Sequence, residues 1–169
     1  MTSKERVLQR EREHAKPMGK AQGKADALEL ANRAAGMDGT AIIAEEDHIP
    51  AFNPKADYSK VPVGAPVIDE DQVWILLQPH NAAHQMGRPS TLRALWGLAH
   101  TKDPQKAKHW VDAYGTSGMY MMDECYKSAD GDVYRAKQDN LVHDAVAFPA
   151  GWEKLEMEML NDLEGGGNE

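Results

Sequence analysis

The amino-acid sequence predicts a mainly β fold of the α+β class, in which two small antiparallel β modules in tandem follow a helical N-terminal leader. The first observation is Asp130-Gly131, a strong hairpin signal with alternating polar and aromatic residues on both sides. The second is a weaker copy of this stretch upstream. The third is that aromatic residues make up only 7% of the chain and are rich in Trp, which fits small β modules better than one large core.

The clearer module lies within residues 120–152. Side chains of the strand after the turn should alternate between the two faces of a sheet, so that Tyr134 and Ala136 face one way and Val133 the other. A polar loop follows, and Trp152 closes the stretch. This stretch is therefore predicted to form a small, aromatic-rich β unit.

The weaker copy spans residues 61–96. When the two copies are aligned, Trp74 corresponds to Tyr134, and Trp96 takes the closing position of Trp152. Two copies are too few for a solenoid, so the repeat predicts two separate modules of the same kind.

Residues 1–36 are predicted to form a helical leader that attaches or oligomerises the protein. Gly36 is a plausible stop, and Pro17 should break the helix. Beyond Pro17, small and apolar residues recur at alternating intervals of three and four, which is a heptad seam with a polar Asn in it. Two interpretations remain open: the helix packs on its own domain, or it joins copies of the chain in a short bundle. The seam consists of Met18, Ala21, Ala25, Leu28, Asn32 and Ala35.

A linker is predicted at residues 37–60, which are rich in proline and charge. Within it, the apolar run at residues 40–44 could form a strand. The first module is assigned to residues 61–109 and the second to residues 110–156.

Two further helices are predicted inside and after these modules. Residues 90–100 place apolar side chains on one helical face after a capping Ser90. From Glu153 onward the apolar spacing also predicts a helix, whose end occupies residues 157–169 together with a flexible tail.

Composition limits the functional classes. A net charge of −8 argues against nucleic acid as a partner, because phosphate binding needs clustered Lys and Arg. No apolar segment is long enough for membrane insertion, and no signal peptide is recognisable. The single Cys125 cannot form an intrachain disulfide and is expected to be a buried, inert thiol.

The sequence carries no recognisable catalytic constellation, so we expect a protein that is not an enzyme and needs no cofactor. His80 and His84 have the spacing of metal ligands on a helix, but Pro79 makes a shared helical face doubtful. No metal site is therefore predicted.

The motifs of the two copies resemble the small chitin-binding type of carbohydrate-binding module, which occurs on chitinases and, in modified form, on bacteriophage tail and virion proteins. The resemblance covers roughly the C-terminal two thirds of the chain, and Trp110 stands where the family has its leading Trp. The second copy departs from the pattern at Asp123-Glu124, where the family has Gly-Asp, and the first departs at Asp71. The matching residues are Tyr120, Gly131, Tyr134, Ala136, Pro149 and Trp152 in the second copy, and Gly64, Val67, Trp74 and residues 77–80 in the first.

This resemblance implies a non-enzymatic bacteriophage structural protein, made in the host cytoplasm and located in the virion. It would be a tail, fibre or capsid-decoration component whose modules bind cell-surface polysaccharide or other virion proteins, and a homo-oligomer is expected. The alternative is a freestanding carbohydrate-binding module of a glycoside hydrolase system.

Aromatic side chains are the candidate carbohydrate-binding residues, because sugar rings present flat C–H faces to which exposed rings can bind. The closing residues Trp96 and Trp152 are expected in the core. Trp110, Tyr114 and Tyr120 are expected to be more exposed, because they flank a glycine-rich loop. The full candidate set is Trp110, Tyr114, Tyr120, Tyr134 and Trp74.

Overall fold

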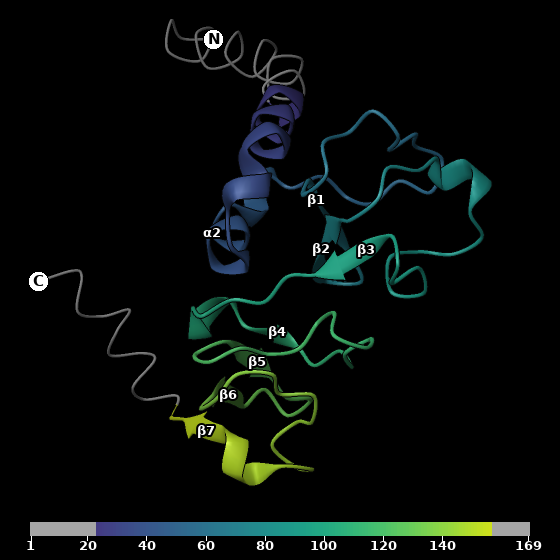
Figure 1. Cartoon of the computed structure of the whole chain (residues 1–169). Coiled ribbons are helices and arrows are strands. Elements are labelled where there is room, and N and C mark those ends of the chain that lie inside the picture. Colours follow the sequence, from purple (N-terminus) through teal and green to yellow (C-terminus); the bar gives the residue numbers. More distant parts are fainter. Residues whose placement is uncertain (1–22, 157–169) are drawn as a thin grey trace, which may run out of the picture.

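The computed structural model describes residues 23–156 and has a mainly β fold with two antiparallel-rich sheets, which confirms the predicted fold class (Figure 1). The helix over residues 23–33 and α2 lie at one end, beside the first sheet, and the second sheet lies below them in this view. The helical elements are a helix over residues 23–33, α2 (Gly39–Ala44) and short 3-10 turns at Ala34–Gly36, Glu46–His48, Ala82–His84, Pro104–Lys106 and Pro149–Gly151. The strands are β1 (Pro66–Asp69), β2 (Gln72–Leu76), β3 (Trp96–Leu98), β4 (Lys108–His109), β5 (Cys125–Lys127), β6 (Val133–Ala136) and β7 (Trp152–Leu155).

The leader is helical over residues 23–33, as predicted, and ends in the 3-10 turn Ala34–Gly36, whereas residues 1–22 lie outside the described part of the chain. Leu30 and Ala34 are buried in a cluster that includes Val73 of β2, so the helix packs on the first sheet. The predicted seam lies on a different face. Its members Ala25, Leu28, Asn32 and Ala35 are all exposed.

Residues 39–44 form α2, so the strand predicted at residues 40–44 is wrong. Asp38 caps the helix, because its Oδ1 accepts a hydrogen bond of 2.8 Å from the backbone N–H of Ala41. Consecutive apolar residues Ile42 and Ile43 are both buried against the leader helix and the first sheet. The cap and this packing outweigh the β preference of two isoleucines.

The first sheet has the strand order β1-β2-β3, all antiparallel. Glu70 and Asp71 connect β1 to β2 with φ values of 53° and 60°, which is the positive φ that a type I′ turn requires at both positions. The helix predicted at residues 90–100 is wrong, because Trp96 pairs with Leu76 in β3. The helical spacing of its apolar residues corresponds to single turns before β3, one of which is closed by the hydrogen bond from the Leu92 N–H to the carbonyl of Arg88.

The second sheet has the order β4-β5-β6-β7, in which β4 is parallel to β5 and the others are antiparallel. The predicted hairpin is confirmed: β5 and β6 are joined by residues 128–132, with Gly131 at a φ of 89°. The predicted alternation also holds, since Val133 and Tyr134 belong to different clusters. The helix predicted from Glu153 is wrong where the structure describes it, because residues 152–155 form β7.

The repeat is visible in the strand register. Trp96 pairs with Leu76 in the first sheet, and Trp152 pairs with Ala136 at the equivalent place in the second. The repeat also includes a parallel neighbour before the first hairpin strand: Ala51 bridges to Ile68, and His109 pairs with Lys127. The residues that follow these two, Phe52 and Trp110, are therefore equivalent.

Phe52 belongs to the range that the sequence suggested as a linker, yet it packs into the aromatic core of the first module. Its ring meets Trp96 edge-on at 5.8 Å, as Trp110 meets Trp152 at 5.9 Å. Tyr58 and Tyr120 complete the two sets, stacked on Phe52 and Trp110 respectively.

The second sheet begins with β4, at the end of the range that the sequence assigned to the first module, and it is in direct contact with the first sheet. The Gln72 side chain donates a hydrogen bond of 2.9 Å to the carbonyl of His109, and Glu46 forms ion pairs with Lys106 and Lys108. The Thr40 hydroxyl accepts a hydrogen bond from the backbone N–H of Lys102. These contacts fix the second sheet against the first.

Candidate functional site

The five candidate residues fall into three groups. Trp74 and Tyr120 are only 1% exposed and belong to the core, so the expectation that Tyr120 is exposed is wrong. Tyr114 is 61% exposed, as expected, but it stands apart on the loop after Asp112. Trp110 and Tyr134 are half-buried and line the same cleft.

This cleft lies on the second module and has a volume of about 600 Å³. It is bordered by the start of the module, the β5–β6 hairpin loop and the long loop between β6 and β7. Three aromatic rings and several polar side chains share its wall. The lining residues are His109, Trp110, Tyr126, Lys127, Ser128, Ala129, Asp130, Asp132, Tyr134, Asp144 and Val146.

Trp110 is held by packing on its inner side. Its ring stacks on Tyr120 with centroids 5.0 Å apart and an interplanar angle of 12°, and it meets Tyr126 edge-on at 5.0 Å. Its indole N–H donates a hydrogen bond of 2.8 Å to Asp112. The ring is therefore fixed in one orientation, with its other side toward the cleft.

Tyr126 and Tyr134 form a cross-strand pair. They are register partners in β5 and β6, and their rings stack 5.3 Å apart at an angle of 17°. The Tyr126 hydroxyl accepts a hydrogen bond of 2.9 Å from the backbone N–H of Ala145, and burial raises the pKa of this phenol. Tyr126 thus fixes the β6–β7 loop, while the half-buried Tyr134 remains accessible.

Three carboxylates border the rings, and two of them also hold the loops. Asp144 accepts hydrogen bonds from the backbone N–H groups of Val146 and Ala147, and Asp132 lies 3.5 Å from the ammonium group of Lys154. Asp130 is exposed at the tip of the hairpin loop. Rigid rings beside carboxylate oxygens suit a ligand with flat C–H faces and many hydroxyl donors.

The sequence missed several of these residues. Asp130 stands out in the sequence only as part of the hairpin signal, and Tyr126, Asp132 and Asp144 are not among the candidate residues. The partner of Tyr134 could have been found from the hairpin, because a turn centred near Gly131 places Tyr126 opposite Tyr134. The position of Asp144 depends on the fold of the long β6–β7 loop and carries no sequence signal.

The equivalent place in the first module has different contents. Phe52 replaces Trp110, and the pocket there is bordered by Asp69 and Arg88. The Arg88 guanidinium donates two hydrogen bonds to the Asp69 carboxylate, at 2.9 and 3.0 Å. Trp74, which corresponds to Tyr134, is buried beneath Arg93. The accessible ring pair is therefore a feature of the second module.

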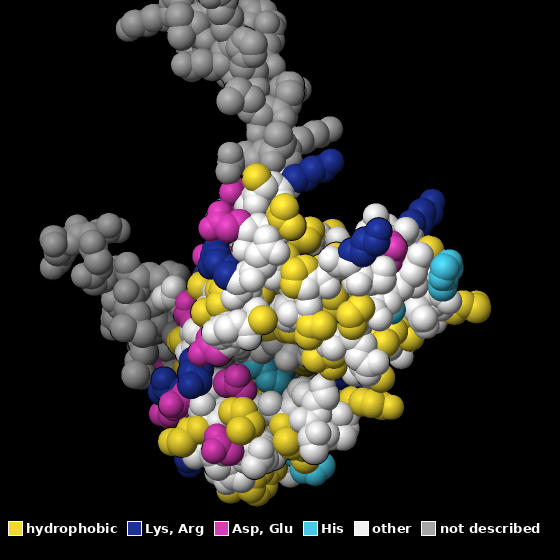
Figure 2. All heavy atoms as spheres, turned by 45° about the horizontal axis from the view of Figure 1, so that its top comes forward, with side chains coloured by type: hydrophobic (Ala, Val, Ile, Leu, Met, Phe, Trp, Pro, Cys, Tyr) yellow, Lys and Arg dark blue, Asp and Glu magenta, His cyan; other side chains and the backbone are white. Residues whose placement is uncertain are grey.

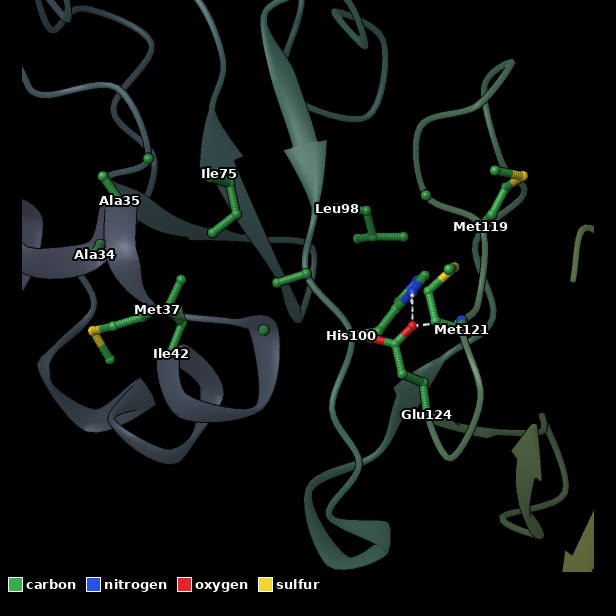
Figure 3. Close-up of a pocket in the computed structure, with 14 residues that line it drawn as sticks. Ala34, Ala35, Met37, Ile42, Ile75, Leu98, His100, Met119, Met121 and Glu124 are labelled. Atoms are coloured by element: carbon green, nitrogen blue, oxygen red, sulfur yellow. Dashed lines mark hydrogen bonds and ion pairs between the residues drawn. The ribbon is translucent and has the colours of Figure 1, made fainter. Parts of the chain in front are cut away.

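A smaller pocket of about 270 Å³ lies where the leader helix, the first sheet and the second module meet (Figure 3). Glu124 points toward both His100 and Met121: its Oε1 is 3.6 Å from His100 Nδ1 and accepts a hydrogen bond of 2.7 Å from the Met121 backbone N–H. The rest of its wall is mainly apolar, including Ile42 and Leu98. The residues that line this pocket come from the end of the leader, from α2, from the first sheet and from residues 118–124, so they connect these parts of the fold.

Cys125 is 2% exposed on β5, which confirms that the thiol is buried, and burial raises its pKa to about 12. Among residues 23–156, no group of three or more His, Cys, Asp or Glu side chains is placed to hold a metal ion. In the same range, no helix has the length and apolar character of a membrane span.

No protein-family model matches the sequence, and no curated protein gives a significant match.

Proposed function

We propose that the chain is a non-enzymatic structural protein of a bacteriophage virion that binds polysaccharide in the cleft of its second module. The observation that carries the proposal is the pair Trp110 and Tyr134, two half-buried rings in one cleft of about 600 Å³ with carboxylates beside them. Stacking on sugar C–H faces would supply affinity, and the carboxylates would accept hydrogen bonds from hydroxyl groups.

The rigid construction of the cleft supports binding. Trp110 is fixed by stacking on Tyr120 and by its hydrogen bond to Asp112, and Tyr134 by stacking on Tyr126. A wall that is already ordered loses little conformational entropy when a ligand binds. The location in a tail, fibre or capsid decoration rests on the resemblance of the repeat motifs. Protein mass spectrometry of purified particles would test it.

The binding proposal is tested with the full chain and a soluble N-acetylglucosamine oligosaccharide, alongside cellulose and bacterial surface polysaccharides, by calorimetry and pull-down. We expect the Tyr134→Ala variant to lose at least about tenfold in affinity for the bound glycan, which corresponds to about 1.4 kcal/mol. Asp130→Ala should also weaken binding, because its exposed carboxylate lies on the same wall.

Tyr114→Ala is the matched control. It removes an aromatic ring that is more exposed than Tyr134 but does not line the cleft, so it should bind as the unmodified chain does. A Tyr114→Ala variant that lost binding while Tyr134→Ala kept it would place the site elsewhere. If the chain bound no polysaccharide of the panel, the proposal of polysaccharide binding would fail, and other virion proteins would be the expected partners of the modules.

A further inference from the structure

The 23–33 helix has two different long faces. Leu30 is fully buried against the first module, whereas Leu28 is 61% exposed. Ala25 and Asn32, which lie one turn before and after Leu28, are exposed as well. In an α-helix, residues two positions apart lie about 200° apart around the axis, so Leu28 does not share the buried face of Leu30. It lies at the edge of the helix, where it borders a groove with the first module and is otherwise open to solvent.

The exposed face is the one that carries the heptad pattern. With Ala25 and Asn32 at a positions and Leu28 at a d position, Leu30 falls at an f position, opposite the seam. A helix with this arrangement can pack on its own domain through f and on a second helix through a and d at the same time. The helix can therefore pack on its own domain and also join two copies of the chain, so the two interpretations left open by the sequence are compatible.

The charges beside the seam are complementary for one particular partner. Lys24 takes the g position before Ala25, and Glu29 takes the e position of the next heptad. In a parallel pair of identical helices, a g residue lies beside the e residue of the following heptad on the partner. Lys24 of one copy would therefore meet Glu29 of the other, twice by symmetry. The Glu29 side chain is 73% exposed and lies 3.7 Å from the Arg33 guanidinium.

We propose that this face pairs with the same face of a second copy of the chain as a parallel, two-stranded coiled coil centred on Leu28. Asn32 at an a position favours two strands in one register. The same spacing continues in the sequence through Ala21 and Met18, which lie outside the described residues.

The surface beside Leu28 extends the apolar area available to a partner. Leu28 and Ala31 line a groove of about 280 Å³ together with Val61 and Pro62 of the first module. Hydrophobic side chains are spread over much of the face shown in Figure 2, and most of the Asp and Glu side chains in view gather along its left edge.

The first test is the solution mass of the full chain by light scattering, at several concentrations. The unmodified chain should be a dimer, and Leu28→Glu should be a folded monomer, because Leu28 is 61% exposed and borders a surface groove rather than filling the core of its own copy. A matched Leu77→Glu variant, which changes another partly exposed leucine away from the helix, should remain dimeric. An unmodified chain that is a monomer or a trimer, or a Leu28→Glu dimer of unchanged affinity, would overturn the proposal.

The second test separates a pairing defect from a folding defect. Lys24→Glu should weaken the dimer at least about fivefold, and adding Glu29→Lys to it should restore the affinity. Oxidation of an Asn32→Cys variant should link two copies only in a parallel, in-register pair. A double charge variant as weak as the single one, or an Asn32→Cys dimer that forms no disulfide on oxidation, would exclude this arrangement. Neither result depends on glycan binding by the second module.

Discussion

Arg88 donates two hydrogen bonds to Asp69 in a pocket of the first module. This pocket occupies the position that corresponds to the cleft of the second module. The two pockets are equivalent in the repeat, because Phe52 and Trp110 follow equivalent bridge positions. The first module thus keeps the strand arrangement of the second but places an ion pair where the second has Ser128 and accessible rings.

The first prediction is that each chain binds one glycan. Arg88→Ala removes the ion pair from the first module but leaves the second unchanged, so the affinity and the stoichiometry of one ligand per chain should both persist. Isothermal titration calorimetry measures them together. A second binding event in the variant would mean that the ion pair alone blocks the first pocket.

A second prediction concerns two glycines with positive φ. At Gly64, with φ of 98°, a Cβ atom would lie 2.9 Å from the Ala35 Cα, whereas at Gly131, with φ of 89°, it would meet nothing within 4 Å. Gly131→Ala should lower the free energy of unfolding by about 1–2 kcal/mol, the cost of left-handed backbone for alanine. Gly64→Ala should cost more, because backbone must also move. Urea denaturation of both variants tests the order, and equal losses would contradict the predicted backbone clash.

The third prediction is a dependence of stability on acid pH. Partial burial opposes ionisation of Glu46, but the hydrogen bond and charge of Lys108, with the charge of Lys106, hold the pKa of this carboxyl below its ordinary value. A lowered folded-state pKa stabilises the fold above the unfolded-state pKa, and this contribution is lost as the pH falls through the folded-state value.

Glu46→Gln removes this contribution. The variant should therefore be less stable than the unmodified chain at pH 7, by about 1 kcal/mol, and the difference should shrink below the ordinary pKa of a glutamate. Thermal unfolding across the pH range measures it. Asp47→Asn, on the same 3-10 turn, is the control. A Glu46→Gln difference that stayed constant into acid would exclude the linkage.

The fourth prediction concerns Cys125. Burial raises the pKa of its thiol to about 12, so little thiolate exists at pH 8 and the sulfur is shielded from solvent. A disulfide exchange reagent should label the chain in denaturant at least about a hundredfold faster than the folded chain. Fast labelling of the folded chain would show that β5 opens readily.

The sequence predicted the second module better than the first. The hairpin at Gly131 and the alternation of Val133 and Tyr134 follow from local turn chemistry and strand period, and both are present. The strand predicted at residues 40–44 failed because an Asp38 cap and tertiary burial decided the conformation. The helix predicted at residues 90–100 failed because helical spacing there reflects single turns before β3.

The candidate site was predicted only in part. Aromatic residue type indicated Trp110 and Tyr134, but it could not separate them from Trp74 and Tyr120, which are buried. Which rings remain accessible depends on long-range packing, such as the stacking of Tyr120 on His100 at 3.6 Å. Flanking a glycine-rich loop therefore predicted the exposure of Tyr114 correctly but that of Tyr120 wrongly.

The contacts that fix the second module on the first determine how a dimer would meet a polymer. Leu30 anchors the helix to the first module, and Glu46 and Gln72 bind that module to the second, so both clefts of a coiled-coil dimer would keep a constant separation. Once one cleft has bound a polysaccharide chain, the second cleft would meet other repeats of the same polysaccharide at a high effective concentration. Avidity can exceed single-site affinity by about 10²–10⁴-fold when the spacing fits. The inter-module contacts would then select polymers by the distance between their repeats.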